Sequence, residues 1–520
     1  MAAAASSTNR PGALEITRRL AEICGPPFAR FAGPADEVAG RTARWVAVPG
    51  GPHAAAEVLR LAAAHDLTVV PRGAGTKIDW GAAPVQVDIL LDTGRLAGVW
   101  HEPPGSPVAE IGAGTPMRAV QASLDRTGRR LPVDVPSPGA TLGGVLAADE
   151  AGPLRHRHGS PCAQLVGVRY LDADGELISI GASGTASLGR AAPTAHEQAG
   201  GGGAVSAGLA GGAWPGGGAG LAGGAGLGRG AAPGGGAGLV GGAGALFGVG
   251  DLPGLDVARL LCGSQGGLGV LVSATLRVQA VPASRVWVSR PVWTPLEVHD
   301  LVRAVLAARL DPAAVELDLP VSVPLPRRRV SPWHPSVAGR PDHPALAGRS
   351  TRPAAAGSLV VLLEGGPADV AERAERLTAL LGGDAVASHA APEWWGRYPF
   401  GPGDTALRFE VPINDLHAAV YALRDAAGGP VPVRGSAGVG TVHAALPGSL
   451  APDRVASILA AVREVLLARQ GRCVVVSAPA PVRRVVDLWG ELPALPRLRT
   501  AKAHLDPHHR LAPGRLPGGL

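Results

Sequence analysis

A glycine-rich turn at residues 69–77 carries residue types that bind anionic oxygens. It reads Val-Val-Pro-Arg-Gly-Ala-Gly-Thr-Lys, so an apolar strand leads into two glycines, a hydroxyl and two cations. Successive backbone N–H groups in such a turn can form a concave nest for anions, and glycine lets a ligand approach the backbone closely. Arg72 and Lys77 add positive charge, and Thr76 adds a hydroxyl donor. The pattern favours a pyrophosphate site, although glycines that only turn the chain would look the same.

The order of residues in this turn does not fit the two commonest nucleotide-binding loops. A Walker loop needs a glycine directly before its lysine and a hydroxyl directly after it, whereas Thr76 precedes Lys77 here. The Rossmann fingerprint needs a third glycine at position 78, which is Ile78. The sequence therefore predicts neither a common ATPase nor a common nicotinamide-binding enzyme.

Strands and helices alternate around this turn. Apolar residues at helical spacing predict helices over 53–65 and 117–126. Shorter apolar or alternating runs predict strands over 67–71, 85–92 and 108–113, and a hairpin of 166–171 with 176–180. A second turn rich in glycine and proline lies between these groups, and it reads Pro136-Ser137-Pro138-Gly139-Ala140-Thr141-Leu142-Gly143-Gly144.

The periodic pattern is lost between residues 183 and 247. Roughly half of the residues from 200 to 250 are glycine, and Arg229 is the only charged residue before position 251 in that stretch. Such a composition cannot offset the entropy lost on ordering by burying apolar surface. The sequence predicts a disordered Gly/Ala-rich insertion over 183–247.

A second α+β region follows, predicted as an antiparallel sheet with helices on one face. A Pro/Arg-rich loop over 320–353 interrupts it. The tail from Asp487 to Leu520 has few periodic features, and we expect it to pack back on the first domain. The predicted strands are 286–288, 359–363, 407–411, 431–433, 441–445 and 473–477, and the predicted helices are 295–308, 368–381, 415–427 and 454–469.

Composition excludes several classes of function. The formal net charge is +6 over 520 residues, and the tightest basic cluster, Arg327-Arg328-Arg329, lies in the Pro-rich loop. We expect a solvated loop there rather than a polyanion site, and no nucleic-acid partner. Residues 1–20 lack the apolar run of a signal peptide, and we expect no transmembrane segment. The prediction is a cytoplasmic protein, or one associated with a membrane through partners.

The placement of the cysteines also fits a cytoplasmic protein. The four cysteines lie far apart and form no C-x-x-C pair, which argues against a zinc or iron–sulfur site. We expect free thiols in a reducing compartment. They are Cys24, Cys162, Cys262 and Cys473.

Several motifs in order along the chain resemble one family. They look like the FAD-binding domain of the vanillyl-alcohol oxidase/p-cresol methylhydroxylase (PCMH-type) superfamily, and are most similar to FAD-binding subunits of bacterial glycolate oxidases. Asp487-x-Trp489-Gly490 near the tail also fits these subunits. The other motifs are Pro71-Arg72-Gly73-x-Gly75-Thr76, Gly139-Ala140-Thr141-Leu142-Gly143-Gly144, Gly152-Pro153-x-Arg155-x-x-x-Gly159, Gly167-Val168 with Asp174-Gly175, Gly254-Leu255-Asp256-x-x-Arg259-Leu260, Gly263-Ser264-x-Gly266-x-Leu268-Gly269-Val270, and Leu505-Asp506-Pro507 with Pro513-Gly514-Arg515.

The resemblance implies an α+β fold: a PCMH-type FAD-binding domain of two α+β subdomains, a smaller α+β cap domain and the disordered glycine-rich insertion. The expected division is an N-terminal segment 1–35, the FAD-binding domain 36–182, the insertion 183–247, the end of the FAD-binding domain 248–283, the cap or substrate domain 284–480, and a C-terminal segment 481–520 that returns to the flavin domain.

The resemblance also implies roles for individual residues around a non-covalent FAD. The pyrophosphate would lie on Arg72, Gly73, Ala74, Gly75, Thr76 and Lys77. The adenine and flavin side would be lined by Pro136, Ser137, Thr141, Gly143 and Gly144, and the pocket wall would be shaped by Gly152 and Gly159. No catalytic base is identified.

The chain also departs from the family. The stretch Ser160–Gln164 lacks the usual acidic residue, residues 250–256 read Gly-Asp-Leu-Pro-Gly-Leu-Asp, and Ala512 replaces an asparagine. A segment that carries metal-binding imidazoles in relatives reads Ser436-Ala437-Gly438-Val439-Gly440-Thr441-Val442-His443 here. A metal needs several converging ligands, so we expect His443 to be a strand residue of the cap and predict no metal.

Six other side chains in the second half of the chain could take part in binding. We expect Arg434 to be solvated rather than to bind a substrate carboxylate, although an arginine can bind one bidentately. Trp394 and Trp395 are expected to pack in the cap core rather than stack on a substrate. The tail histidines match no ligand spacing and are expected to be solvated; they are His504, His508 and His509.

The function implied is the FAD-binding subunit of a glycolate or 2-hydroxy-acid oxidase-like complex. A flavoprotein and an iron–sulfur subunit would be its partners. Two alternative hypotheses remain: the protein is a non-catalytic structural subunit that has lost FAD, or it is a stand-alone flavin oxidase of an alcohol or sugar.

Overall fold

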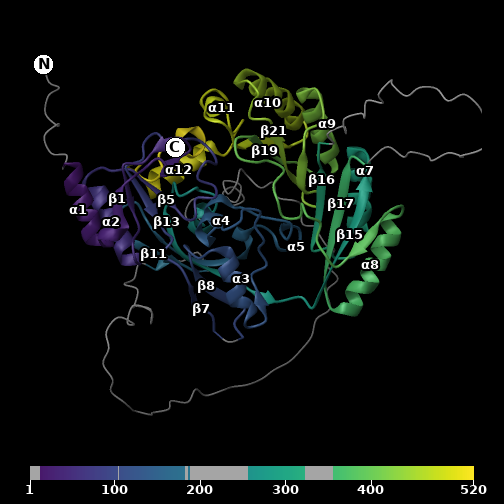
Figure 1. Ribbon diagram of the computed structural model, residues 1–520, viewed down its shortest axis with the longest axis horizontal. Coiled ribbons are helices and arrows are strands. Elements are labelled where there is room, and N and C mark those ends of the chain that lie inside the picture. The colour runs from purple at the N-terminus through teal and green to yellow at the C-terminus, as the bar shows by residue number, and fades with distance from the viewer. Residues whose placement is uncertain (1–11, 104, 182–185, 188–255, 322–354) are drawn as a thin grey trace, which may run out of the picture. The chain divides into compact units, whose positions relative to one another are not determined.

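Two sheets of different type form the part of the described chain that precedes residue 284 (Figure 1). The computed structural model describes residues 12–103, 105–181, 186–187, 256–321 and 355–520. The first sheet has the order β1-β4-β6-β5, in which β4, β6 and β5 run parallel and β1 is antiparallel. Its strands are β1 (Ala29–Phe31), β4 (Trp45–Ala47), β5 (Val69–Arg72) and β6 (Ile89–Asp92).

Two helices cover this first sheet and share its core. They are α1 (Ala13–Cys24) and α2 (Pro52–Ala64). Buried apolar side chains of both helices pack with those of the strands, among them Ile16 and Leu20 of α1. Helix α1 lies in the predicted N-terminal segment, where no helix was expected from the pattern.

The second sheet is antiparallel throughout and has the order β12-β11-β10-β13-β8-β7. The helices α3 (Met117–Asp125) and α4 (Leu142–Ala148) pack on it through residues such as Val120 and Leu146. The strands are β7 (Val99–His101), β8 (Val108–Gly112), β10 (Leu165–Leu171), β11 (Leu177–Ile180), β12 (Ala186–Ser187) and β13 (Val270–Arg277). The predicted pair of α+β subdomains is therefore confirmed.

The third sheet forms the cap and has eight strands in the order β18-β15-β17-β16-β20-β21-β19-β22. All of its pairings are antiparallel, as predicted. The helices α7 (Pro295–Ala307), α8 (Pro367–Leu381), α9 (Leu416–Ala427) and α10 (Pro452–Leu467) share one apolar core with it. The strands are β15 (Ser284–Val292), β16 (Ala314–Leu319), β17 (Gly357–Gly365), β18 (Val386–Ser388), β19 (Thr405–Glu410), β20 (Val433–Ser436), β21 (Thr441–Leu446) and β22 (Arg472–Ser477).

Short elements complete the described chain. The helices and 3-10 turns are η1 (Pro26–Phe28), α5 (Arg155–His158), η2 (Pro161–Gln164), α6 (Val257–Leu261), η4 (Ile413–Asp415), α11 (Ala480–Val485), α12 (Leu495–Leu505) and η5 (Pro517–Gly519). The short strands are β2 (Glu37–Val38), β3 (Arg41–Thr42), β9 (Arg129–Arg130) and β14 (Gln279–Ala280).

Two predicted strands have different bounds in the structure. β6 begins at Ile89 rather than at residue 85, because Val85 N donates to Pro513 O of the C-terminal segment, 2.8 Å away, and not to a neighbouring strand. β20 covers 433–436 rather than 431–433, because Pro432 has no N–H to donate to a ladder. Of the predicted insertion, only Ala186–Ser187 are described, as β12; the rest of it, the loop 322–354 and its arginine cluster lie outside the described residues.

The C-terminal segment packs on the first sheet, as predicted. Val69 N donates to Arg510 O at 2.8 Å and Ala512 N donates to Val69 O at 2.9 Å, so the tail lies beside β5. The three tail histidines, His504, His508 and His509, are exposed. The segment therefore supports the strand that leads into the glycine-rich turn at 72–77.

The expectation of four free thiols is wrong. Cys162 of η2 and Cys262, which follows α6, form a disulfide, while Cys24 and Cys473 are free and buried. Sequence spacing could not show this pairing, because the two cysteines are 100 residues apart and meet only in the folded chain. The bond holds the segment that resumes at residue 256 against the second sheet.

We expect reduction of this disulfide to lower the free energy of unfolding by about 2–4 kcal/mol, since the unfolded chain regains freedom. Denaturant unfolding with and without reductant measures the difference, and thiol titration of the denatured chain should give two thiols before reduction and four after it. The double variant Cys162→Ala/Cys262→Ala should not respond to reductant. Four titratable thiols in the non-reduced protein would contradict the assignment.

Candidate functional site

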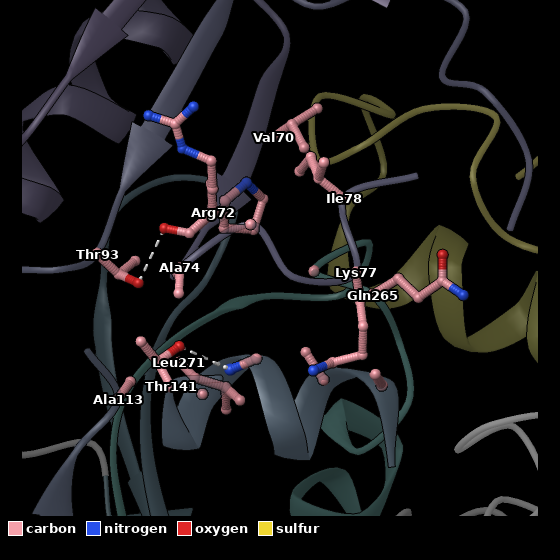
Figure 2. A pocket seen from close by; sticks show the side chains of 18 of the residues that line it. Val70, Arg72, Ala74, Lys77, Ile78, Thr93, Ala113, Thr141, Gln265 and Leu271 are labelled. Atoms are coloured by element: carbon pink, nitrogen blue, oxygen red, sulfur yellow. Dashed lines mark hydrogen bonds between the residues drawn. The ribbon is translucent and has the colours of Figure 1, made fainter. Parts of the chain in front are cut away.

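A pocket of about 100 Å³ opens at the C-terminal end of β5 (Figure 2). It brings together the two glycine turns that the sequence singled out. Its lining includes all six residues from Arg72 to Lys77, and Thr141, Gly143 and Gly144 at the start of α4. The further lining residues are Val70, Pro71, Ile78, Trp80, Thr93, Ala113, Ala147, Ala148, Ser264, Gln265, Gly266, Gly269, Leu271 and Arg515.

Close backbone approach explains the glycines of this pocket. A Cβ on Gly73 would collide with the Thr141 side chain, and a Cβ on Gly143 would lie 2.9 Å from that of Ala113. Gly75 has φ +73°, a conformation that other residues rarely adopt. The Thr141 hydroxyl accepts from Gly144 N and begins α4, a helix where the sequence suggested only a turn.

Both cations of the first turn are paired with carboxylates. The Arg72 guanidinium lies 3.1 Å from Asp36 and 3.0 Å from Asp92, and Figure 2 shows it directed away from Thr141 and Lys77. Lys77 Nζ lies 2.6 Å from Glu150 Oε2. Both positive charges of the turn are therefore balanced within the fold, and the turn offers chiefly its backbone N–H groups.

Arg515 brings a cation that was not among the predicted site residues. Its guanidinium donates to the carbonyl oxygens of Ile78 at 3.0 Å and Trp80 at 2.8 Å. No carboxylate hydrogen-bonds to it among the described residues, and burial lowers its pKa to about 10, so it stays charged at neutral pH. The Pro513-Gly514-Arg515 motif was the signal that could have identified it.

The remaining predicted residues lie outside this pocket. Pro136 and Gly152 line a second cavity instead. Ser137 N donates to Glu150 Oε1 at 3.0 Å. Gly159 ends α5 with φ +77° and lines neither cavity. Any role for these four around a cofactor stays a prediction.

The second cavity is small, about 30 Å³, and lies against the sheet face of the cap that its helices leave free. Polar residues follow one another across that face in register. Asp318, Arg434, His443 and Arg408 form one row across β16, β20, β21 and β19, and Glu316, Ser436, Thr441 and Glu410 form the next. The cavity is lined by Pro136, Ala151, Gly152, Pro153, Arg155, Glu316, Trp394, Gly396, Arg397, Tyr398, Arg434, Gly435, Ser436, Thr441 and His443.

The structure shows the surroundings of the cap residues for which the sequence allowed more than one role. Arg434 is not solvated: its Nε donates to Asp318 Oδ1 at 2.7 Å, and it lies against the Trp394 ring. Trp394 lines the second cavity rather than the core, whereas Trp395 packs on Trp287 beside a small apolar cluster. His443 is a residue of β21, as predicted.

Burial makes two groups of the second cavity neutral at physiological pH. It lowers the pKa of His443 to about 3, with further lowering by the Arg408 and Arg155 guanidiniums. It raises the pKa of Glu316 to about 8, and Glu316 Oε1 has no hydrogen-bond partner among the described residues. The cavity therefore holds a neutral imidazole, a protonated carboxyl and at least one guanidinium.

Glu316 should make the protein less stable as pH rises. Its pKa is higher in the folded chain, so between about pH 5 and 8 the folded state binds a proton that the unfolded state has lost, and stability falls by about 1.4 kcal/mol per pH unit. Asp134, whose pKa is raised to about 7 by burial, acts in the same direction. Urea unfolding across this range should show Glu316→Gln losing less stability than the parent. A parallel pH dependence of the two proteins would contradict the expectation.

The described residues offer neither a metal site nor a membrane span. No group of three or more His, Cys, Asp or Glu side chains that could hold a metal ion lies in the described part of the chain. No helix among residues 12–103, 105–181, 256–321 and 355–520 is long and apolar enough to cross a membrane.

Comparison with known proteins identifies the cofactor. Residues 43–181 match the family described as FAD binding domain. A D-lactate dehydrogenase of Archaeoglobus fulgidus is 28% identical over 31% of this chain and 37% of its own length. A D-2-hydroxyglutarate dehydrogenase of Xanthomonas citri pv. viticola is 29% identical over 27% of this chain and 31% of its own length. The chain spans about a third of the length of the curated relatives it matches, and its cofactor is FAD.

Solved structures match over nearly the whole chain. p-Cresol methylhydroxylase with substrate bound has a TM-score of 0.61 and 14% identity, over 96% of both chains. An alkyldihydroxyacetonephosphate synthase has a TM-score of 0.60 and 13% identity, over 98% of this chain and 86% of the other. These matches show a shared PCMH-type fold. The pocket beside β5 fits FAD, because its glycine-rich turn lets a ligand approach the backbone closely and Arg515 supplies charge for a diphosphate.

Proposed function

We propose that this protein is an FAD-dependent oxidoreductase that oxidises a small 2-hydroxy acid, as the FAD-binding subunit of a glycolate oxidase-like complex. The observation that carries the proposal is a hydrogen-bonded link between the linings of the two cavities, through Glu150. Glu150 bonds to Lys77 of the FAD pocket on one side and to Tyr398 of the second cavity on the other. A substrate in the second cavity would therefore lie next to the cofactor site.

The second cavity suits a short acid. Arg434 and Arg155 line it, and a guanidinium is a strong partner for a carboxylate. The cavity is small, about 30 Å³, which favours a short acid over a longer diacid. FAD, when bound, accepts a hydride from the hydroxyl-bearing carbon, which is chemistry that no amino-acid side chain supplies.

The roles in FAD binding follow from the same geometry. The backbone N–H groups of Gly73–Lys77 would hold the diphosphate, with Gly143 and Gly144 letting it approach the start of α4 and Arg515 as the compensating cation. The FAD would be bound non-covalently, as the family resemblance implies. The resemblance to glycolate oxidase subunits supports a flavoprotein and an iron–sulfur subunit as partners, to which the electrons would pass, and a cytoplasmic location.

Cofactor release and anaerobic reduction test the proposal. FAD should leave the denatured protein without a covalent link. Glycolate or D-lactate should bleach the flavin absorbance of the native protein, and D-2-hydroxyglutarate should do so more slowly. Protein without flavin would favour a structural subunit, and bleaching by a simple alcohol or sugar alone would favour a stand-alone oxidase; either result would overturn the proposal. Co-expression with partner subunits should raise turnover with an artificial acceptor.

A further inference from the structure

A buried carboxylate separates the FAD pocket from the second cavity. The Glu150 side chain is fully buried and lies two residues beyond the end of α4. It accepts three hydrogen bonds, from Lys77 Nζ at 2.6 Å, from Ser137 N at 3.0 Å and from the Tyr398 hydroxyl at 3.1 Å. Burying a carboxylate is costly unless it has partners. Glu150 has Lys77 on the side of the FAD pocket and Tyr398 on the side of the second cavity.

Tyr398 is the member of this group that faces the second cavity. Its ring lies 4.8 Å from that of His443, and both residues line the cavity. Burial and the neighbouring Glu150 carboxylate raise the pKa of the Tyr398 phenol well above its usual value, so the phenol stays protonated. Its proton points to Glu150, which leaves the lone pairs of its oxygen free to accept a proton from a hydroxyl group in the cavity.

The other titratable groups of the cavity are poorly suited to accept a proton. His443 is a very weak base, because burial and the Arg408 and Arg155 guanidiniums disfavour its charged form. Glu316 is already protonated at neutral pH, because burial raises the pKa of its carboxyl to about 8. Efficient proton transfer needs an acceptor within hydrogen-bond reach. Glu150, which is paired with Lys77 and hydrogen-bonded to Tyr398, is the carboxylate that meets this condition through Tyr398.

We propose that Tyr398 is the catalytic residue that takes the proton of the substrate hydroxyl and that Glu150 receives the proton which Tyr398 gives up. The inference rests on the proposed function. The substrate O–H bond and the Tyr398 O–H bond break while new O–H bonds form on Tyr398 and on Glu150. The substrate carbon would become a carbonyl, with bound FAD supplying the acceptor for its hydride, so that one proton and one hydride leave the substrate. Glu150 ends as a carboxylic acid and Tyr398 as a neutral phenol.

Lys77 links this proton transfer to the FAD pocket. Its side chain is 6% exposed, and its charge is balanced by Glu150 at 2.6 Å. When Glu150 takes up a proton, the Lys77 ammonium loses its counter-charge at the pocket wall. In a buried setting such a cation strongly favours negative charge nearby, so the relay would support electron transfer into the pocket.

Glu150→Gln and Tyr398→Phe test the relay without changing the shape of either side chain much. Each should slow flavin reduction by the 2-hydroxy acid about 10²–10⁴-fold, the usual contribution of a positioned proton acceptor. The double variant should be no slower than the slower single variant. Substrate dissociation constants should stay within a few-fold of the parent, and Glu150→Asp should recover part of the rate. Tyr398→Phe keeps the Lys77–Glu150 pair, so it serves if Glu150→Gln fails to fold.

Matched controls and a second readout separate the relay from mere structure. Tyr421→Phe on α9 and Glu372→Gln on α8 change exposed residues of the same types and should leave the rate unchanged. FAD content and the flavin spectrum should be the same in all variants. Normal reduction rates in both relay variants would overturn the relay while leaving the proposed function intact. A parent that holds FAD but is reduced by no 2-hydroxy acid would overturn the proposed function and the relay with it.

Discussion

Gly73→Val is expected to yield protein that folds but retains no FAD. Gly73 lies where the two glycine turns approach each other most closely, and any Cβ there would collide with the Thr141 hydroxyl and lie 3.2 Å from its Cβ. Because Thr141 begins α4, the side chain cannot move without also disturbing the N–H groups that follow it. Flavin-to-protein ratio after purification measures the effect, and we expect a loss of more than ten-fold.

The matched control is Gly366→Val, at the start of α8. A Cβ there meets nothing within 4 Å, and its φ of −71° suits any residue. A second comparison shows that the collision itself is the cause: Gly73→Ala should lose part of the FAD, and adding Thr141→Ala should restore some of it despite the lost helix cap. Full flavin occupancy in Gly73→Val would remove the pocket beside β5 from consideration as the FAD site.

Local patterns predicted this pocket well because its parts are encoded locally. The turn of Arg72–Lys77 and the turn at Thr141–Gly144 are short runs whose glycines have a geometric reason, and their convergence is observed. Period and turn chemistry of the same kind predicted the alternating strands and helices, whereas the two-subdomain fold was implied by the family resemblance that the ordered motifs carry. α4 was missed because two glycines lower helix propensity, while the Thr141 cap and packing of Leu142, Val145 and Leu146 in the core outweigh it.

The charges could not be assigned in the same way, because their partners are distant in sequence. Arg72 pairs with Asp36 and Asp92, and Lys77 pairs with Glu150, 73 residues away. In the cap, strand order places Asp318 beside Arg434, 116 residues further on. The residue type tells which charge a side chain carries, but only the tertiary fold shows whether that charge is already paired with another residue. The cavity on the cap sheet, the relay group Glu150 and the Cys162–Cys262 bond therefore came from the structure.

Lys502→Met is expected to lower the free energy of unfolding by about 3–5 kcal/mol and to weaken FAD binding, because it leaves a buried charge without its partner. Lys502 Nζ, fully buried in α12, donates to Asp506 Oδ2 at 2.6 Å, Gly267 O at 2.7 Å and Leu511 O at 2.8 Å. Gly267 follows the lining residue Gly266, and Leu511 lies beside β5 at Val69. One ammonium thus joins the tail to two walls of the FAD pocket.

The charge left on Asp506, rather than lost packing, should dominate this effect. Asp506 also accepts from Arg510 N and Leu511 N, so an amide can keep part of its contacts. The double variant Lys502→Met/Asp506→Asn should therefore recover more than half of the lost stability, measured by denaturant unfolding, and much of the FAD affinity. Arg499→Met, exposed on the same helix, should change neither quantity. If the double variant is no more stable than Lys502→Met, packing rather than charge holds the tail, and its connection to FAD binding must run through other contacts.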